Sequence, residues 1–91
     1  MYEIRYTNQF KRSLKKCIKR GLDIHILQTA LNILQQEGEL PNQYRPHKLS
    51  GKYYPYWECH LQPDWLLIWD QNDKELTLMF MDTGTHADLF K

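Results

Sequence analysis

The chain has 91 residues, enough for one small domain and too few for two. Hydrophobic residues make up 42% of it, with three Trp, six Tyr and three Phe, which excludes a disordered chain and allows a compact core. The formal net charge is +1, and no apolar run approaches the roughly 20 residues that span a bilayer. The start also lacks a signal-peptide pattern. We therefore expect a cytoplasmic protein with one domain over residues 1–91 and no membrane partner.

The small net charge conceals an uneven distribution along the chain. No acidic residue occurs between Ile4 and Arg20, where the basic residues are Arg5, Lys11, Arg12, Lys15, Lys16, Lys19 and Arg20. From Glu58 to Phe90 acidic residues dominate and Lys74 is the only Lys or Arg. A basic segment of this kind can bind nucleic-acid phosphates or an acidic protein, and it can equally be a solvated helix face.

The N-terminal part predicts one strand and two helices. Residues 2–6 alternate apolar and polar side chains, which is the period of a half-buried strand. Thr7 can cap the helix that follows, and Gly21 can end it. Asp23 can cap a second helix that ends near Gly38. The turn between them is short, so we expect an antiparallel helical hairpin.

The rest of the chain predicts a loop and a β-meander. Proline and glycine punctuate residues 39–55, which is typical of a loop. Strands are predicted over residues 56–61, 65–70 and 75–81. Thr85 and Asp88 resemble a capping box for a last helical turn. The order β-α-α-β-β-β predicts an α+β fold, with an antiparallel sheet, the helical hairpin packed on one face and a short C-terminal helical turn.

The two cysteines, Cys17 and Cys59, fit a reducing compartment. Two thiols in a chain of this size are weak evidence for a disulfide framework. Cys17 also falls on the apolar stripe of the first predicted helix. We therefore expect both cysteines to be reduced and to act as packing residues.

Three of the four histidines lie beside residues that could give them a chemical role. His47 precedes a lysine, His60 lies four residues before Asp64, and His86 follows a glycine-containing turn at the end of the last predicted strand. Histidine can exchange a proton near neutral pH, so such residues suit acid–base chemistry. His25 lies in the first turn of the second helix and is expected to be structural or on the surface.

The turn between the second and third predicted strands decides what His60 can contact. If residues 61–63 form the turn, His60 lies opposite Asp64 on one face of the sheet. A two-residue turn would shift the register and separate them. We expect the first arrangement, because it places the apolar side chains on the other face; these are Trp57, Cys59, Trp65, Leu67 and Trp69.

The residue types also allow phosphate binding and metal binding. Arg45, Lys48 and Lys52 on the polar loop can form a phosphate-binding edge, although loop cations also serve solubility alone. Zinc ligand types are present as His47, Cys59, His60, Asp64 and His86. Their spacing matches no metal motif, and adjacent strand residues such as Cys59 and His60 point to opposite faces. We therefore expect no metal.

Three segments resemble the YafQ branch of the RelE/ParE toxin superfamily, in this order and at these separations. They are residues 47–51 (HKLSG), 58–68 (ECHLQPDWLLI) and 83–90 (TGTHADLF). The predicted element order resembles that family too, so the resemblance covers essentially the whole chain.

The resemblance implies a toxin of a type II toxin–antitoxin system that acts as a ribosome-dependent mRNA endonuclease, or mRNA interferase. In that family the RNA 2′-hydroxyl is the nucleophile and the product carries a 2′,3′-cyclic phosphate, with no metal and no cofactor. The implied partners are a cognate antitoxin protein, the ribosome and mRNA, and operator DNA only through the antitoxin.

The resemblance also implies which residues form the site. The expected catalytic set is His47, His60, Asp64 and His86. The expected substrate-binding residues are Lys48, Lys52, Trp65 and Phe90, with Phe90 helping to seat a base. We expect His86 to be the general acid and His60, oriented by Asp64, to be the base. His47 with Lys48 or Lys52 would then hold the phosphate.

One position departs from the family pattern. Asp82 stands where the family usually has an arginine, and an aspartate there would repel a phosphate. Other cations could compensate, catalysis could be weakened, or Asp82 could orient His86. The alternative function is accordingly a toxin-fold binding module without strong catalysis, either an antitoxin-dependent co-repressor or a gyrase inhibitor like the ParE branch.

Overall fold

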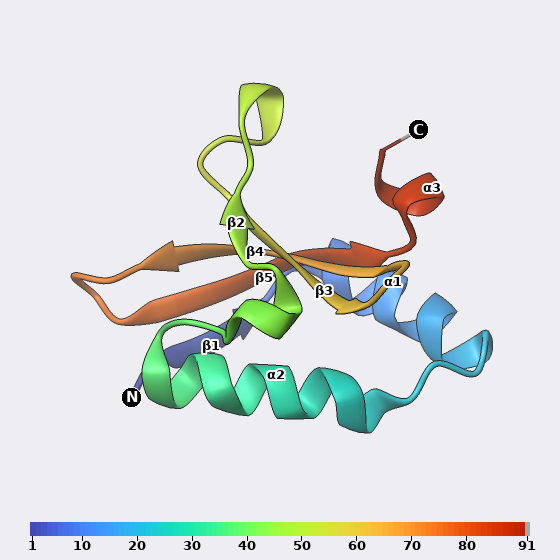
Figure 1. The fold of residues 1–91 in the computed structure, drawn as a ribbon, viewed down its shortest axis with the longest axis horizontal. Coiled ribbons are helices and arrows are strands. Elements are labelled where there is room, and N and C mark those ends of the chain that lie inside the picture. Colours follow the sequence, from blue (N-terminus) through green and yellow to red (C-terminus); the bar gives the residue numbers. More distant parts are fainter. Residues whose placement is uncertain (91) are drawn as a thin grey trace.

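A five-stranded sheet in the order β1-β5-β4-β3-β2 forms the centre of the molecule (Figure 1). The computed structural model describes residues 1–90. Its helices and strands are β1 (Glu3–Tyr6), α1 (Asn8–Lys19), α2 (Ile24–Glu37), the 3₁₀ turn η1 (Asn42–Tyr44), β2 (His47–Lys48), the 3₁₀ turn η2 (Gly51–Tyr53), β3 (Trp57–Gln62), β4 (Trp65–Asn72), β5 (Thr77–Gly84) and α3 (His86–Leu89). Figure 1 shows α2 on one side of the sheet, with the η2 loop and α3 on the other.

The predicted helix ends are confirmed by their caps. The Thr7 hydroxyl accepts a hydrogen bond from the Phe10 amide at the start of α1. The Asp23 carboxylate accepts one from the His25 amide at the start of α2. Gly38 ends α2 in the left-handed conformation, with φ of 72°. The bonds to Thr7 and Asp23 satisfy amides that a helix leaves unpaired in its first turn. The left-handed Gly38 is a common way for a helix to end.

The main core lies between the two long helices and one face of the sheet. Its buried residues are Phe10, Cys17, Leu27, Ala30, Leu31, Leu34, Leu40, Tyr44, Cys59, Leu61, Trp65, Leu67, Trp69, Leu78 and Phe80. Trp57 is half-buried and stacks on Trp69, with ring centroids 6.1 Å apart. The apolar face predicted for β3 and β4 is therefore confirmed. Leu66 and Ile68, on the opposite face, are buried as well.

The α+β fold is confirmed, but the sheet is mixed rather than purely antiparallel. β1 lies parallel to β5, with Glu3 paired to Thr77 and Tyr6 to Phe80. Parallel neighbours need a long connection, and here most of the chain lies between the two strands. Alternation within residues 2–6 cannot reveal a partner so distant in sequence.

The strands also differ from the prediction in number and in their bounds, chiefly at β2 and at the end of β5. β2 lies within the segment expected to be a loop, and it pairs antiparallel with β3 through His47–Glu58 and Lys48–Trp57. β5 continues through Thr83 and Gly84, which were expected to form a turn. β2 and the last residues of β5 are each stabilised by pairing with a neighbouring strand. Local turn propensity does not encode such pairing.

The β3–β4 hairpin has the register that the sequence argument disfavoured. Gln62 pairs with Trp65, so the turn contains only Pro63 and Asp64. His60 pairs with Leu66, which leaves Leu61 as an extra residue in a β-bulge. The bulge lets both Leu61 and Trp65 face the core. The apolar side chains therefore still lie on the core face of the hairpin despite the shorter turn. His60 and Asp64 are consequently not cross-strand partners.

Within residues 1–90, no helix has the length and apolar character that crossing a membrane requires. His25 lies exposed at the start of α2, against the Asp23 cap, as expected for a structural or surface residue.

Both cysteines should be inert towards thiol reagents in the folded protein. Burial raises the pKa of the Cys17 thiol, and burial together with the nearby Glu58 carboxylate raises the pKa of Cys59 to about 12. The thiolate is the reactive form, so a disulfide reagent at neutral pH should label neither cysteine in native protein and both in guanidinium chloride. Rapid labelling of native protein would contradict this burial.

Candidate active site

Histidines from two different elements meet on the side of the sheet opposite α2. His60 lies on β3, and His86 is the first residue of α3. Their ring centroids are 5.7 Å apart, with the ring planes tilted by 54°. Both rings are partly exposed, so a substrate can reach them.

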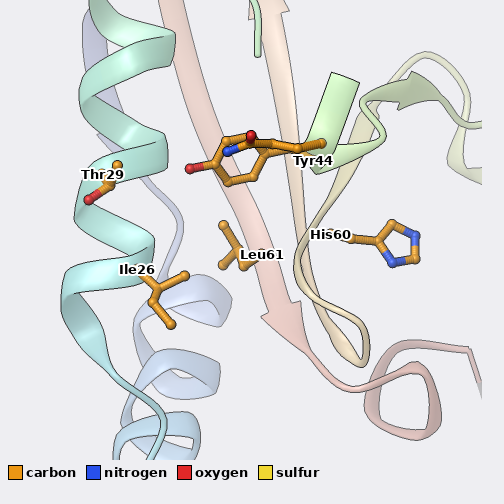
Figure 2. A pocket seen from close by; sticks show the side chains of 6 residues that line it. Ile26, Thr29, Tyr44, His60 and Leu61 are labelled. Carbon is orange, nitrogen blue, oxygen red and sulfur yellow. The ribbon is translucent and has the colours of Figure 1, made fainter. Parts of the chain in front are cut away.

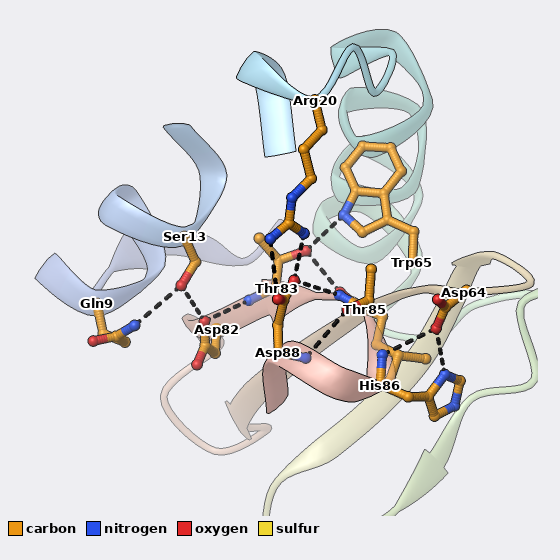
Figure 3. A network of polar contacts seen from close by, with 11 residues as sticks. Gln9, Ser13, Arg20, Asp64, Trp65, Asp82, Thr83, Thr85, His86 and Asp88 are labelled. Carbon is orange, nitrogen blue, oxygen red and sulfur yellow. Dashed lines mark hydrogen bonds and ion pairs between the residues drawn. The ribbon is translucent and has the colours of Figure 1, made fainter. Parts of the chain in front are cut away.

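Asp64 binds His86 rather than His60. Its Oδ1 accepts a hydrogen bond from the His86 backbone amide at 3.0 Å and lies 2.6 Å from His86 Nδ1 (Figure 3). These two bonds lower the pKa of the Asp64 carboxyl, which therefore stays ionised. An ionised carboxylate only accepts hydrogen bonds, so His86 Nδ1 must be the donor. Nε2 is then the nitrogen of His86 that can exchange a proton with a substrate.

The pairing of Asp64 with His86 corrects the expected pairing with His60. The two-residue turn places Asp64 at the tip of the β3–β4 hairpin, where α3 begins. His60 remains on β3, and its ring lies beside the ring of His86. The carboxylate thus serves the residue expected to be the acid instead of the one expected to be the base.

His47 has acceptors at both ring nitrogens. Nδ1 lies 2.9 Å from the Arg45 carbonyl oxygen, and Nε2 lies 3.2 Å from Oε1 of Glu58. A carbonyl oxygen only accepts, so Nδ1 carries a proton. His47 thus donates from Nδ1 to the Arg45 carbonyl and faces the buried Glu58 carboxyl through Nε2.

Glu58 is a site residue that sequence analysis missed. It is only 5% exposed, and its Oε2 is buried without a hydrogen-bond partner among the described residues. Burying a carboxylate is costly unless a cation or donor faces it, and here His47 does so across the β2–β3 pair. The available signal was an acidic residue inside an apolar strand, two positions before His60 and therefore on the same face.

Trp65 is a core residue and not an accessible substrate-binding residue, which corrects its expected role. It is 1% exposed. Its indole N–H donates to the Thr83 hydroxyl at 2.9 Å, and that hydroxyl donates to the Leu66 carbonyl at 2.6 Å (Figure 3). These bonds tie β4 to β5 immediately before α3.

The remaining expected substrate-binding residues are accessible. Lys48 and Lys52 are exposed, with their ammonium groups over the rings of Trp57 and Tyr53 respectively. Phe90 is 39% exposed and meets the edge of Tyr53 at 5.4 Å between ring centroids.

Asp82 does not contact the histidines in the described residues. It accepts hydrogen bonds from the Ser13 hydroxyl of α1 and from the Thr83 amide. Figure 3 shows it directed towards α1, on the other side of α3 from His86. Asp64, and not Asp82, therefore orients the His86 ring.

A cavity of about 370 Å³ between α2, η1 and β3 adjoins this site. Ile26, Thr29, Tyr44 and Leu61 line it (Figure 2). His60 also lines the cavity, and Figure 2 shows its ring directed away from α2.

A family model described as "Bacterial toxin of type II toxin-antitoxin system, YafQ" matches residues 2–91. The chain belongs to the YafQ family. The resemblance of the three segments is thereby confirmed, and with it the toxin class.

Relatives and solved structures agree with this family. The chain is 37% identical to the mRNA interferase toxin YafQ of Escherichia coli K12 over 89 residues, which covers 97% of this chain and 95% of the relative. The toxin in the crystal structure of the E. coli DinJ–YafQ complex is 35% identical and superposes with a TM-score of 0.89, with full coverage of both chains. The crystal structure of YafQ from E. coli BL21(DE3) is 34% identical and superposes with a TM-score of 0.91, again with full coverage of both chains. The α+β fold and the enzyme class expected from the sequence are confirmed by these YafQ relatives.

Replacing Trp65 should affect stability, because the side chain is buried. Trp65→Phe removes the bond to Thr83 and leaves a small void, which should lower the free energy of unfolding by about 1–3 kcal/mol. Urea denaturation measures this, with the exposed Tyr54→Phe as a control that should leave the midpoint unchanged. An unchanged midpoint for Trp65→Phe would contradict its role in the core.

Proposed function

We propose that this chain is a ribosome-dependent mRNA endonuclease, held inactive by a cognate antitoxin. The observation that carries the proposal is the His86–Asp64 pair next to His60, which provides two imidazoles within reach of one phosphodiester. Family membership and the name of the E. coli relative, an mRNA interferase toxin, support the same activity.

The proposed reaction is an internal transfer at phosphorus. The 2′-oxygen of the RNA forms a bond to phosphorus, the bond to the 5′-oxygen breaks, and the products are a 2′,3′-cyclic phosphate and a free 5′-hydroxyl. His60 takes the proton of the 2′-hydroxyl, and His86 gives a proton from Nε2 to the departing 5′-oxygen. Asp64 holds the His86 ring through Nδ1 and stabilises its protonated form. No step requires a metal.

Positive charge for the phosphate comes from the β2 edge and its loop. His47 and Lys48 form β2, and Lys52 lies exposed in the η2 loop that follows. These groups would meet the charge that develops on the phosphate oxygens. Phe90 would seat a base, since it is exposed beside Tyr53. Asp82 faces α1, so its negative charge is directed away from the histidines.

The proposed partners match the charge distribution. The exposed lysines of α1, which include Lys11, Lys15 and Lys19, form a basic surface for ribosomal RNA or for an acidic antitoxin segment. Contact with operator DNA would occur only through the antitoxin. We further propose that the toxin acts in the cytoplasm, where ribosomes are found.

Removing the proposed acid should abolish most cleavage. His86→Ala should lower the rate of cutting of a translated message by about 10²–10⁴-fold, because the leaving oxygen loses its proton donor. Primer extension on a message translated in a reconstituted system measures this. His25→Ala, an exposed helical histidine against a cap, is the matched control and should cut like the wild type.

Other outcomes, in this assay and on expression of the chain in growing cells, would overturn the proposal. Full activity of His86→Ala would exclude His86 as the acid. Growth arrest by the wild-type chain with intact mRNA and altered DNA topology would indicate a gyrase inhibitor. Neither growth arrest nor cleavage would indicate a co-repressor.

The cleavage step should depend on pH near neutrality, because the scheme needs one imidazole that takes a proton and one that gives a proton. Asp64 stays ionised throughout this range because its hydrogen bonds to His86 lower its pKa. Asp64→Asn replaces the carboxylate that holds Nδ1 of His86, so the rate of cleavage should fall. Single-turnover rates measure this, and Glu75→Gln, an exposed carboxylate in the β4–β5 turn, should leave the profile unchanged. A flat profile in the wild type would contradict the scheme.

A further inference from the structure

The placement of His86 depends on a helix that cannot be stable by itself. α3 contains only His86–Leu89, a single turn, and one turn of helix costs more conformational entropy than its hydrogen bonds return. His60, by contrast, lies on β3 in the middle of a paired ladder. The groups that hold α3 against the rest of the molecule therefore decide where the His86 ring lies.

Asp88 makes most of the polar contacts that hold this turn. Its Oδ2 accepts a hydrogen bond from the Thr85 amide at 3.0 Å, and its own amide donates to the Thr85 hydroxyl at 3.1 Å. Both carboxylate oxygens also accept from the Arg20 guanidinium, at 2.6 Å and 3.1 Å (Figure 3). Arg20 and the Thr85 amide hold the pKa of the Asp88 carboxyl well below its usual range, so it is charged at any physiological pH.

The backbone beneath Asp88 is shaped to admit its carboxylate. A Cβ atom on Gly84 would lie 2.8 Å from Asp88 Oδ2, too close for an ordinary contact. Gly84 also has φ of 154°, which other residues rarely adopt. The last residue of β5 thus lets the carboxylate approach the strand end.

Arg20 connects this carboxylate to the core. It is the C-cap residue of α1, whose Phe10 and Cys17 are buried in the main core. A cation is favoured at a helix C-terminus, and a guanidinium binds a carboxylate through two parallel bonds. An isolated exposed ion pair contributes little to stability. Here, however, the pair joins a rigid helix to the turn that carries His86, so its main effect is on position.

We infer that Asp88, held by Arg20, is a positioning residue for His86 in the cleavage reaction. The pair fixes the first turn of α3 against the end of α1, and Asp64 then receives the His86 amide and ring at the hairpin tip. The catalytic part of this inference rests on the function proposed above. The structural part, that Arg20 and Asp88 order α3, is testable without any substrate.

The test compares Arg20→Ala with Lys19→Ala in the full-length toxin. Both variants remove one exposed cation from the end of α1, but only Arg20 binds Asp88. Arg20→Ala should lower kcat for mRNA cleavage on the ribosome at least about tenfold with little change in KM, because a small displacement of a catalytic group is costly. Lys19→Ala should leave kcat unchanged. Arg20→Lys, which keeps one charged donor, should recover part of the loss.

Amide hydrogen exchange provides the readout that does not depend on activity. In Arg20→Ala the His86 and Leu89 amides should exchange faster, while the Leu67 amide in the core strand β4 should keep its wild-type rate. Asp88→Asn retains an acceptor for the Thr85 amide and loses the ion pair, so it should lie between wild type and Asp88→Ala in both exchange and kcat. This series keeps the inference testable if one variant folds poorly.

The outcomes separate the inference from the proposed function. If the wild type does not cut mRNA, the function fails, and the exchange rates still test whether Arg20 orders α3. If the wild type cuts and Arg20→Ala shows the same kcat and the same His86 exchange, the inference is overturned and the function stands. Equal loss of kcat in Arg20→Ala and Lys19→Ala would also overturn it, because the effect would then come from charge alone.

Discussion

The β3–β4 hairpin is the constraint on which both the core and the site depend. Its turn has only two residues, Pro63 and Asp64, and the Leu61 bulge restores the inward direction of the side chains on either side. Because of the bulge, Trp65 can be buried and bind Thr83 while Asp64, the residue before it, lies at the exposed tip. One hairpin therefore anchors the sheet through an indole and holds the His86 ring through a carboxylate.

The three histidines of the site differ chiefly in their polar neighbours, and this difference gives each of them a different proposed role. His47 has an acceptor at each nitrogen, and the buried Glu58 is one of them. His86 has one nitrogen held by Asp64. His60 lies beside His86 with no carboxylate of its own in the described residues. Three side chains of one type can thus differ in role because their neighbours fix which nitrogens carry protons.

The site is assembled from elements of unequal rigidity. β3 and β4 are paired along their lengths and supply His60 and the hairpin tip, whereas α3 is a single turn at the end of the sheet. Polar contacts hold this turn from three directions, through Asp64 of the hairpin, Arg20 of α1 and the Tyr53 hydroxyl of η2, which donates to the Leu89 carbonyl. A short element can carry a proposed catalytic group when it is tied to rigid neighbours in this way.

Local features of this protein were readable from the sequence, and long-range ones were not. Thr7, Asp23 and Gly38 predicted the helix ends, and Thr85 with Asp88 predicted the last capping box, because each of these signals acts within a few residues. The apolar face of β3 and β4 was also predicted, since side-chain alternation is a local property. The family pattern brought His47, His60, Asp64 and His86 together as a set.

Only the tertiary structure decided which of these residues touch. The parallel pairing of β1 with β5, the bulge at Leu61 and the contact of Asp64 with His86 join segments that are far apart in the chain or depend on a one-residue shift in register. The burial of Trp65 and of Glu58 follows from the same packing. A strand pattern gives the face of each side chain, but its partner depends on register and on competing contacts, which are settled when the whole sheet packs against its helices.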